Sequence, residues 1–91
     1  MKATKATVKK VIKSLGMNID EFKIHSARGI VEVETALEDK EKGNKKVSKL
    51  VKTMIMSGVT FYGFKTGYGA WIYRLNDSDN WSRKLARMNI D

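Results

Sequence analysis

His25 is the one histidine of the sequence and the first residue to consider for acid–base chemistry. A nuclease would pair such an imidazole with a second base, or with a carboxylate cluster that holds a metal ion. Glu32 and Glu34 are expected on the strand face of His25, but alternating acids are also typical of a solvated strand face. Asp77 and Asp79 have a spacing typical of a turn and a helix cap. The sequence therefore predicts no catalytic residue, no metal site and no cofactor, and a nuclease using His25 is only the third hypothesis.

The glycines Gly63, Gly67 and Gly69 raise the question of a phosphate-binding loop. A dinucleotide-binding loop requires G-x-G-x-x-G between a strand and a helix, and a P-loop requires G-x-x-x-x-G-K-[ST]. Neither spacing is present, and the strand-like segment WIYRL follows the glycines. The pattern predicts the turn of a hairpin and not a nucleotide site.

Positive charge is the strongest functional signal. Lysine and arginine number 18 against 10 acids, which gives +8 over 91 residues. Such a charge suits nucleic acid or an acidic protein surface, although solubility alone also explains it. Lysine contacts phosphates as a point charge and does not by itself read sequence. The predicted nucleic-acid-binding residues lie on two helix faces, in the hairpins and in the C-terminal segment: Lys2, Lys5, Lys9, Lys13, Arg28, Lys45, Lys49, Lys52, Lys65, Tyr68, Arg74, Arg83 and Arg87.

Two amphipathic helices are predicted to carry most of these lysines. The first has apolar residues at i, i+3, i+4 and i+7 and begins at a cap from Thr4 or Thr7. A charged connector, residues 37–46, includes a cap at Asn44, and the second helix continues to Gly58. The apolar faces consist of Val8, Val11, Ile12 and Leu15 in the first helix, and of Val47, Leu50, Val51, Met54 and Ile55 in the second.

Two hairpins complete the predicted architecture. Alternating apolar residues predict one hairpin over 21–35, and a second has strands over 59–65 and 70–75 around the letters TGYG. The chain is therefore predicted to be a single α+β domain, residues 1–91. We expect a four-stranded antiparallel sheet in α-β-β-α-β-β order, two helices on one face of the sheet, and a short C-terminal helical tail over 77–91.

The order helix–strand–strand occurs twice, so the sequence also suggests an internal αββ pseudo-repeat over 4–35 and 44–75. A shift of 40 residues places FKIHSARGIVEV, residues 22–33, on YGFKTGYGAWIY, residues 62–73. Both turns then have Ser or Thr followed three residues later by Gly. Shared hairpin geometry without duplication is the alternative explanation.

Aromatic residues of the second hairpin are predicted to share one strand face. The expected cross-strand pairs are Phe64 with Trp71 and Tyr62 with Tyr73, and this face is expected to pack under the helices. The alternative is an exposed aromatic platform on which bases stack. Phe61 falls on the opposite face in this scheme, and a three-residue turn would exchange the two faces.

The absence of cysteine is consistent with a reducing cytosol, so a cytoplasmic location is predicted. The sequence has no run of about 18 apolar residues, and no membrane partner is expected. Unpaired sheet edges favour a homo-oligomer.

The opening helix KATVKKVIKSLG and the segment SGVTFYGFKTGYGAWIYRL, in a short basic chain, resemble the small basic accessory proteins of tailed bacteriophages. The resemblance covers most of the chain but includes no defining motif, so no binding residue is transferred from it. It implies a protein of the host cytoplasm that binds host nucleic acid or inhibits a host defence. One kind within that group is the RNA-binding inhibitor of a toxin–antitoxin ribonuclease.

The predicted function is that of a non-enzymatic nucleic-acid-binding protein, with RNA favoured over DNA and with phosphates bound by the lysine-rich helix faces. The alternative is a protein-binding inhibitor or adaptor that docks on an acidic partner, such as a host protein, without nucleic acid. The two hypotheses are compatible if RNA bridges the protein and its target.

Overall fold

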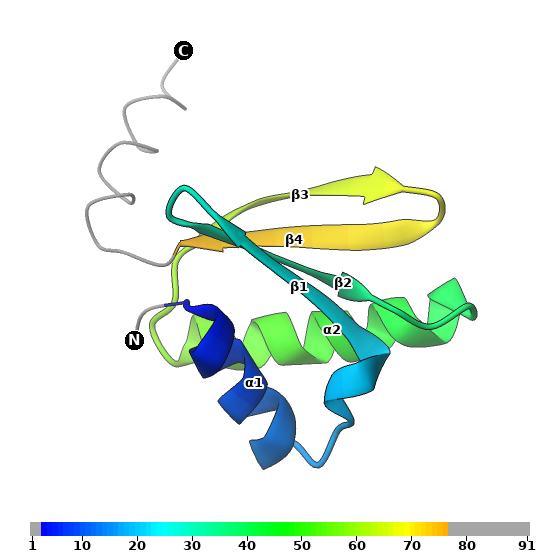
Figure 1. Cartoon of the computed structure of the whole chain (residues 1–91), viewed down its shortest axis with the longest axis horizontal. Helices are drawn as coiled ribbons and strands as arrows, with labels where there is room; N and C mark the ends of the chain where they lie inside the picture. The colour runs from blue at the N-terminus through cyan, green and yellow to red at the C-terminus, as the bar shows by residue number, and fades with distance from the viewer. Residues whose placement is uncertain (1–2, 77–91) are drawn as a thin grey trace.

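The computed structural model describes residues 3–76 and confirms an α+β fold with a four-stranded antiparallel sheet and two α-helices (Figure 1). The predicted helical tail over 77–91 lies outside the described residues. No helix within residues 3–76 is both long and apolar enough to cross a bilayer. In chain order the elements are α1 (Lys5–Ser14), the 3-10 helix η1 (Ile19–Glu21), β1 (Phe22–Ala27), β2 (Ile30–Thr35), α2 (Lys40–Met56), β3 (Phe61–Gly67) and β4 (Ala70–Asn76).

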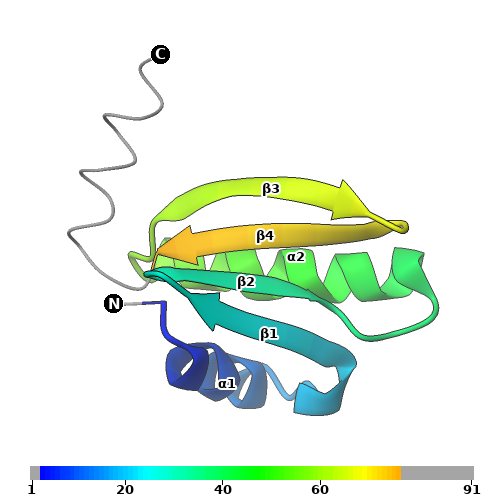
Figure 2. The ribbon, with the colours of Figure 1, turned by 45° about the horizontal axis from the view of Figure 1, so that its top comes forward.

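The sheet has the strand order β1-β2-β4-β3, so the two hairpins meet at their second strands. Both helices pack on one face: α1 against β1 and α2, and α2 against β2 and β4. Figure 2 shows α2 running behind β2 and β4, with β3 at the outer edge of the sheet. The helix layer is therefore centred on β1, β2 and β4, and no helix within residues 3–76 is centred on β3.

The core lies between the helices and the central strands, as the helical spacing of the apolar residues predicts. α1 begins at Thr4, whose side-chain oxygen accepts a hydrogen bond from the Thr7 N–H at 3.1 Å. η1 is joined to α2 by the Lys46 ammonium, which donates to Glu21 Oε2 at 2.6 Å. The buried apolar residues of this core cluster are Ala3, Val8, Val11, Ile12, Phe22, Val31, Val33, Val47, Leu50, Val51, Met54, Val59 and Leu75.

The second helix begins earlier than predicted, and Asn44 is not its cap. Asp39 caps α2 instead, because its Oδ1 accepts a hydrogen bond from the Lys42 N–H at 3.1 Å. Asn44 is buried inside the helix: its Nδ2 donates to the Gly69 carbonyl oxygen, and its Oδ1 accepts from the Trp71 N–H, both at 3.0 Å. This side chain satisfies one backbone group of the turn and one of β4, beyond the last β2–β4 pair, and it attaches α2 to the second hairpin.

Both hairpins have two-residue turns with the same backbone conformation. Arg28 and Tyr68 each have a φ of 53°, and Gly29 and Gly69 have φ values of 79° and 80°. Positive φ at both central residues defines the type I′ turn, whose twist suits a two-residue hairpin. Equivalent turn residues are 40 positions apart, as in the predicted pseudo-repeat. Duplication itself stays a prediction, since hairpin geometry alone produces the same turns.

The predicted aromatic pairs are wrong, because the turn and a β-bulge change the register. Phe64 lies opposite Tyr73, and Trp71 lies opposite Thr66. Pairing shifts between Phe61 and Gly63, so Tyr62 is the extra residue of the bulge. The bulge moves Tyr62 to the helix-free face, where it lines a hollow, and Phe61 joins the helix-side face.

Candidate nucleic-acid interface

Four aromatic residues form an open strip on the helix side of β3 and β4, which we call the aromatic patch: Phe61, Phe64, Trp71 and Tyr73. The Tyr73 ring centroid lies 6.1 Å from that of Phe61 and 5.9 Å from that of Phe64. Tyr73 is half-buried against the core, whereas Phe64 is 58% exposed and Trp71 is 43% exposed. The prediction that this face packs under the helices is confirmed for Tyr73, which packs against the core, and is wrong for the exposed rings of Phe61, Phe64 and Trp71, because α2 packs mainly on β2 and β4.

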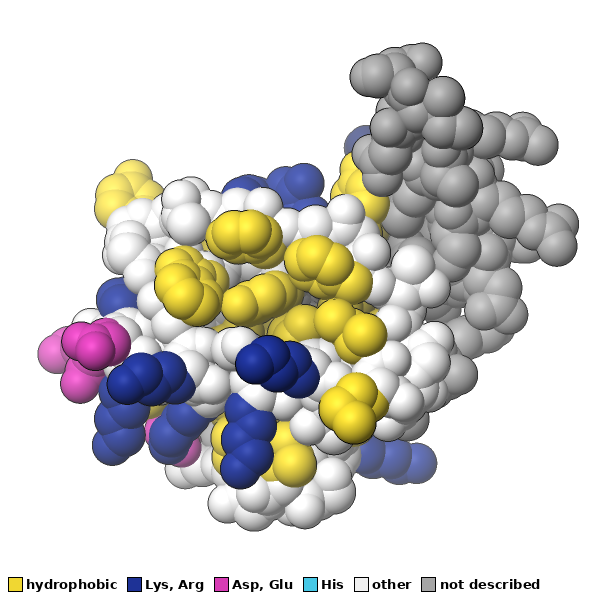
Figure 3. Space-filling view, turned by 180° about the vertical axis from the view of Figure 1, so that it is seen from behind, with side chains coloured by type: hydrophobic (Ala, Val, Ile, Leu, Met, Phe, Trp, Pro, Cys, Tyr) yellow, Lys and Arg dark blue, Asp and Glu magenta, His cyan; other side chains and the backbone are white. Residues whose placement is uncertain are grey.

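A groove of about 410 Å³ separates the outer side of α2 from Trp71. Three exposed lysines of α2 line it, Lys45, Lys49 and Lys52, and we call them the lysine rim. Figure 3 shows hydrophobic side chains gathered on this face, with lysine or arginine side chains along one side of them. The remaining lining residues are Ser48, Thr53, Met56 and Trp71.

The lysine rim is only weakly neutralised by the described part of the chain. Lys45 lies 4.0 Å from Glu41 in an exposed i,i+4 pair, a kind that contributes less than about 1 kcal/mol. Lys49 and Lys52 have no ion pair with any residue in 3–76. Their charges are available to an anionic ligand that enters the groove, and their hydrocarbon stems border its apolar floor.

The other predicted cationic residues do not join this groove. Lys5, Lys9 and Lys13 are exposed on α1, which covers the opposite edge of the sheet. Lys2, Arg83 and Arg87 lie outside the described residues. Within 3–76, the structure therefore assembles the three predicted α2 lysines with Trp71 and separates them from the α1 lysines.

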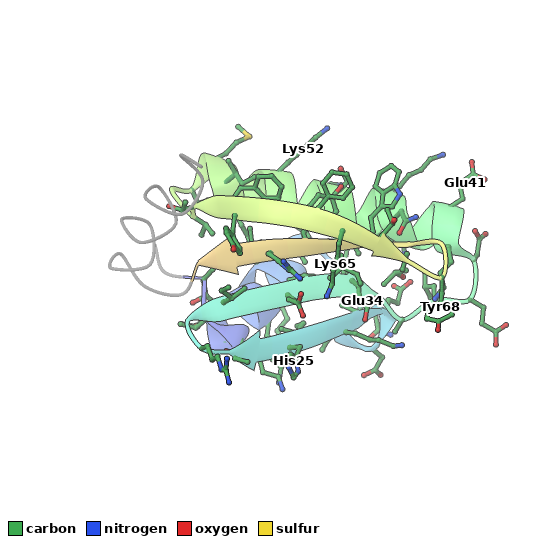
Figure 4. All side chains as sticks on the ribbon, turned by 90° about the horizontal axis from the view of Figure 1, so that it is seen from above. His25, Glu34, Glu41, Lys52, Lys65 and Tyr68 are labelled. Carbon is green, nitrogen blue, oxygen red and sulfur yellow. The ribbon has the colours of Figure 1, made fainter. Side chains whose placement is uncertain are left out.

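Lys65 and Arg74 lie on the helix-free face of the sheet and share one acidic partner. The Nε of Arg74 donates to Glu32 Oε2 at 2.9 Å, and the ammonium of Lys65 lies 3.5 Å from the same oxygen. Figure 4 shows Lys65 above the middle of this face. Both cations are engaged by Glu32, so they are less available to a phosphate than the sequence alone indicated.

The Glu32 cluster predicts a pH-dependent contribution to stability. Burial raises the pKa of Glu32, but the hydrogen bond from Arg74 and the charge of Lys65 outweigh it, and the net pKa is lowered. A lowered folded-state pKa adds stability above the unfolded pKa, near 4.3, and that stability disappears as pH falls through the folded value. Glu32→Gln is therefore expected to lower the free energy of unfolding by up to about 1 kcal/mol at pH 7 and by less near pH 2. Urea unfolding at the two pH values measures the difference.

Glu34→Gln is the matched control for this prediction. Glu34 lies two residues along the same strand and has no ion pair with a residue in 3–76. Its substitution should change stability little at either pH. A loss in Glu32→Gln that is equal at both pH values would contradict an ionic origin.

His25 is exposed on the helix-free face, where it borders a hollow with Tyr62, Arg28 and the Glu32 cluster. No group of three or more potential metal-ligating side chains occurs within residues 3–76. Asp77 and Asp79 lie outside that range. Arg28 and Tyr68 occupy the turn tips as predicted, and the Tyr68 side chain is fully exposed.

None of the four residues of the aromatic patch was among the predicted site residues: Phe61, Phe64, Trp71 and Tyr73. The sequence left an exposed aromatic platform as an alternative, but it did not predict where the helices lie on the sheet, which decides whether the rings are exposed. Ser48 and Met56 lie at helical spacing from the lysines of the second helix, so the sequence did indicate that these residues share the lysine face.

In comparisons with known proteins, no family model, curated protein or solved structure matches this chain.

Proposed function

We propose that this protein is a non-enzymatic nucleic-acid-binding protein that favours RNA over DNA. The observation that carries the proposal is the lysine rim beside exposed aromatic rings, with Lys49 and Lys52 unpaired within residues 3–76. Lysines bind phosphates through counterion release, and aromatic faces stack on bases. The α1 lysines would extend the positive field that guides a polyanion to the groove.

RNA is favoured because exposed aromatic rings require unpaired bases. Cellular RNA presents such bases in loops, bulges and ends, whereas the bases of duplex DNA are stacked on one another. The biological setting implied by the resemblance, a phage protein that counters a host defence or toxin–antitoxin system, belongs to the same proposal.

Purification in low salt tests the function directly. We expect the protein to retain RNA, with an A260/A280 ratio above that of the protein alone, and to release the RNA in high salt or after ribonuclease treatment. If deoxyribonuclease, and not ribonuclease, releases the retained nucleic acid, DNA is the preferred ligand and not RNA. Recovery of protein free of nucleic acid, combined with no oligonucleotide binding in low salt, would contradict the proposal.

Docking on an acidic protein is the second candidate function, and one observation favours it. The aromatic patch includes residues of β3, which is an edge strand of the sheet formed by residues 3–76, and an exposed apolar patch on an edge strand is typical of protein-binding surfaces. The same edge would allow a homo-oligomer. A partner recovered from host lysate unchanged after nuclease treatment would support docking without nucleic acid.

A further inference from the structure

The rings of the aromatic patch form a continuous apolar surface. Phe64 stacks on Tyr73 with an interplanar angle of 27°, and the Phe61 ring also contacts Tyr73. Trp71 lies two residues along β4 from Tyr73 and forms the floor of the groove against α2. The two most accessible rings, Phe64 and Trp71, come from neighbouring strands on one face.

Within residues 3–76, the charged side chains that line the groove all come from α2. They are the three lysines of the lysine rim, and the polar residues Ser48 and Thr53 of the same helix line the groove with them. A ligand that fits must therefore present flat apolar faces toward β3 and β4 and negative charge toward α2. A single nucleic-acid strand with its bases turned out has this division between its two sides.

We propose that the groove and the aromatic patch together bind unpaired bases of single-stranded RNA segments. Bases stack on Trp71 and Phe64, and the phosphates follow the lysine rim along α2. The inference rests on the proposed function and narrows it, because a duplex keeps its base faces stacked internally and could use only the lysines. Stacking is tolerant of base identity, so we expect little sequence preference.

Charge argues against a second copy of this chain as the occupant. A symmetric contact through the aromatic patch would bring two lysine rims toward each other, and Lys49 and Lys52 have no acidic partner within residues 3–76 to compensate. The acidic residue of the sheet centre, Glu32, lies on the opposite face and is already paired. A polyanion is the occupant that the charges of this face favour.

The test compares a labelled oligouridylate with an RNA duplex of equal length by fluorescence anisotropy in low salt, using the full chain. We expect the single strand to bind at least about 10-fold more tightly than the duplex. Trp71→Leu and Phe64→Leu, which keep apolar bulk and remove the ring, should each weaken single-strand binding by about 10-fold and leave duplex binding nearly unchanged. Trp71→Phe, which keeps a ring, should retain most of the affinity.

Tyr62→Leu is the matched control, because Tyr62 is an aromatic residue of the same strand on the opposite face. It should leave the affinity unchanged. Circular dichroism of every variant verifies folding. The chain has two tryptophans, so Trp81→Phe leaves Trp71 as the single tryptophan, and oligouridylate should quench the tryptophan emission directly.

The possible failures are distinguishable. Absence of binding to any nucleic acid would overturn the proposed function together with this inference. Equal affinity for duplex and single strand, or full affinity in both leucine variants, would overturn the inference and leave a lysine-based nucleic-acid-binding protein. A change of oligomeric state in Trp71→Leu without any loss of affinity would identify the patch as a contact between copies and would also overturn it.

Discussion

Lys49→Glu combined with Lys52→Glu is expected to lower the affinity for single-stranded RNA by about 100-fold in low salt, because two lysine–phosphate contacts are lost. Each such contact on a single strand contributes a log–log salt slope of about 0.7. Both residues line the groove and are unpaired within residues 3–76. Glutamates there would also repel the phosphates. Binding isotherms at several salt concentrations measure the affinity, and the salt slope should fall by about 1.4.

Lys5→Glu combined with Lys9→Glu is the matched control on α1. Each Lys→Glu change lowers the net charge by two units, so both double variants have a formal net charge of +4 in place of +8. The α1 variant should lose no more than about 5-fold, because its lysines contribute to the long-range field and not to the groove. Equal losses in the two variants would show that net charge, and not the lysine rim, determines binding.

Gly43→Ala is expected to destabilise the fold by about 2 kcal/mol or more, although alanine favours a helix over glycine by about 1 kcal/mol. A Cβ at Gly43 would lie 2.6 Å from Cβ and 2.7 Å from Cγ2 of Thr35, and it would also overlap the Thr35 hydroxyl. Ordinary carbon–carbon contacts are near 3.5–4.0 Å. Since the Thr35 Cβ is fixed to the β2 backbone, α2 would have to move away from the sheet. Urea unfolding monitored by circular dichroism measures the loss.

Gly67→Ala is the matched control, because a Cβ there meets only Ile72 Cδ1 at 3.8 Å, an ordinary contact. It should change stability by less than about 1 kcal/mol. Thr35→Gly removes the atoms that block Gly43→Ala, so the double variant should be more stable than the sum of the two single changes implies. If the two changes in the free energy of unfolding were strictly additive, the contact with Thr35 would not be what limits side-chain size at position 43.

The same close approach explains why the aromatic patch is open. Gly43 allows α2 to contact β2 at Thr35, and the Asn44 side chain attaches α2 to the second hairpin through hydrogen bonds with the backbone of Gly69 and Trp71. These contacts hold the helix over the two central strands. No helix among the described residues is left to cover β3, and the rings of Phe64 and Trp71 stay exposed.

Local patterns in the sequence determined the elements of this fold. The spacing of Val8, Val11 and Ile12 predicted α1 and its buried face, and alternation around Arg28 and Tyr68 predicted both hairpins. These features depend on residues within a few positions of one another, so periodicity and turn preference suffice to predict them. The lysines of α2 were predicted as a basic face for the same reason.

Only the tertiary structure decided which of these residues form one surface. The bulge at Tyr62 depends on the pairing of β3 with β4, and it exchanges Tyr62 and Phe61 between the two faces of the sheet. The ion pairs of Lys65 and Arg74 with Glu32 depend on the pairing of β4 with β2. The prediction of Asn44 as a cap was wrong because its partners, Gly69 and Trp71, are more than 20 residues away in the chain, where local patterns do not reveal them. The sequence by itself determined a basic α+β protein with aromatic hairpins, whereas long-range packing placed its lysine rim beside exposed rings.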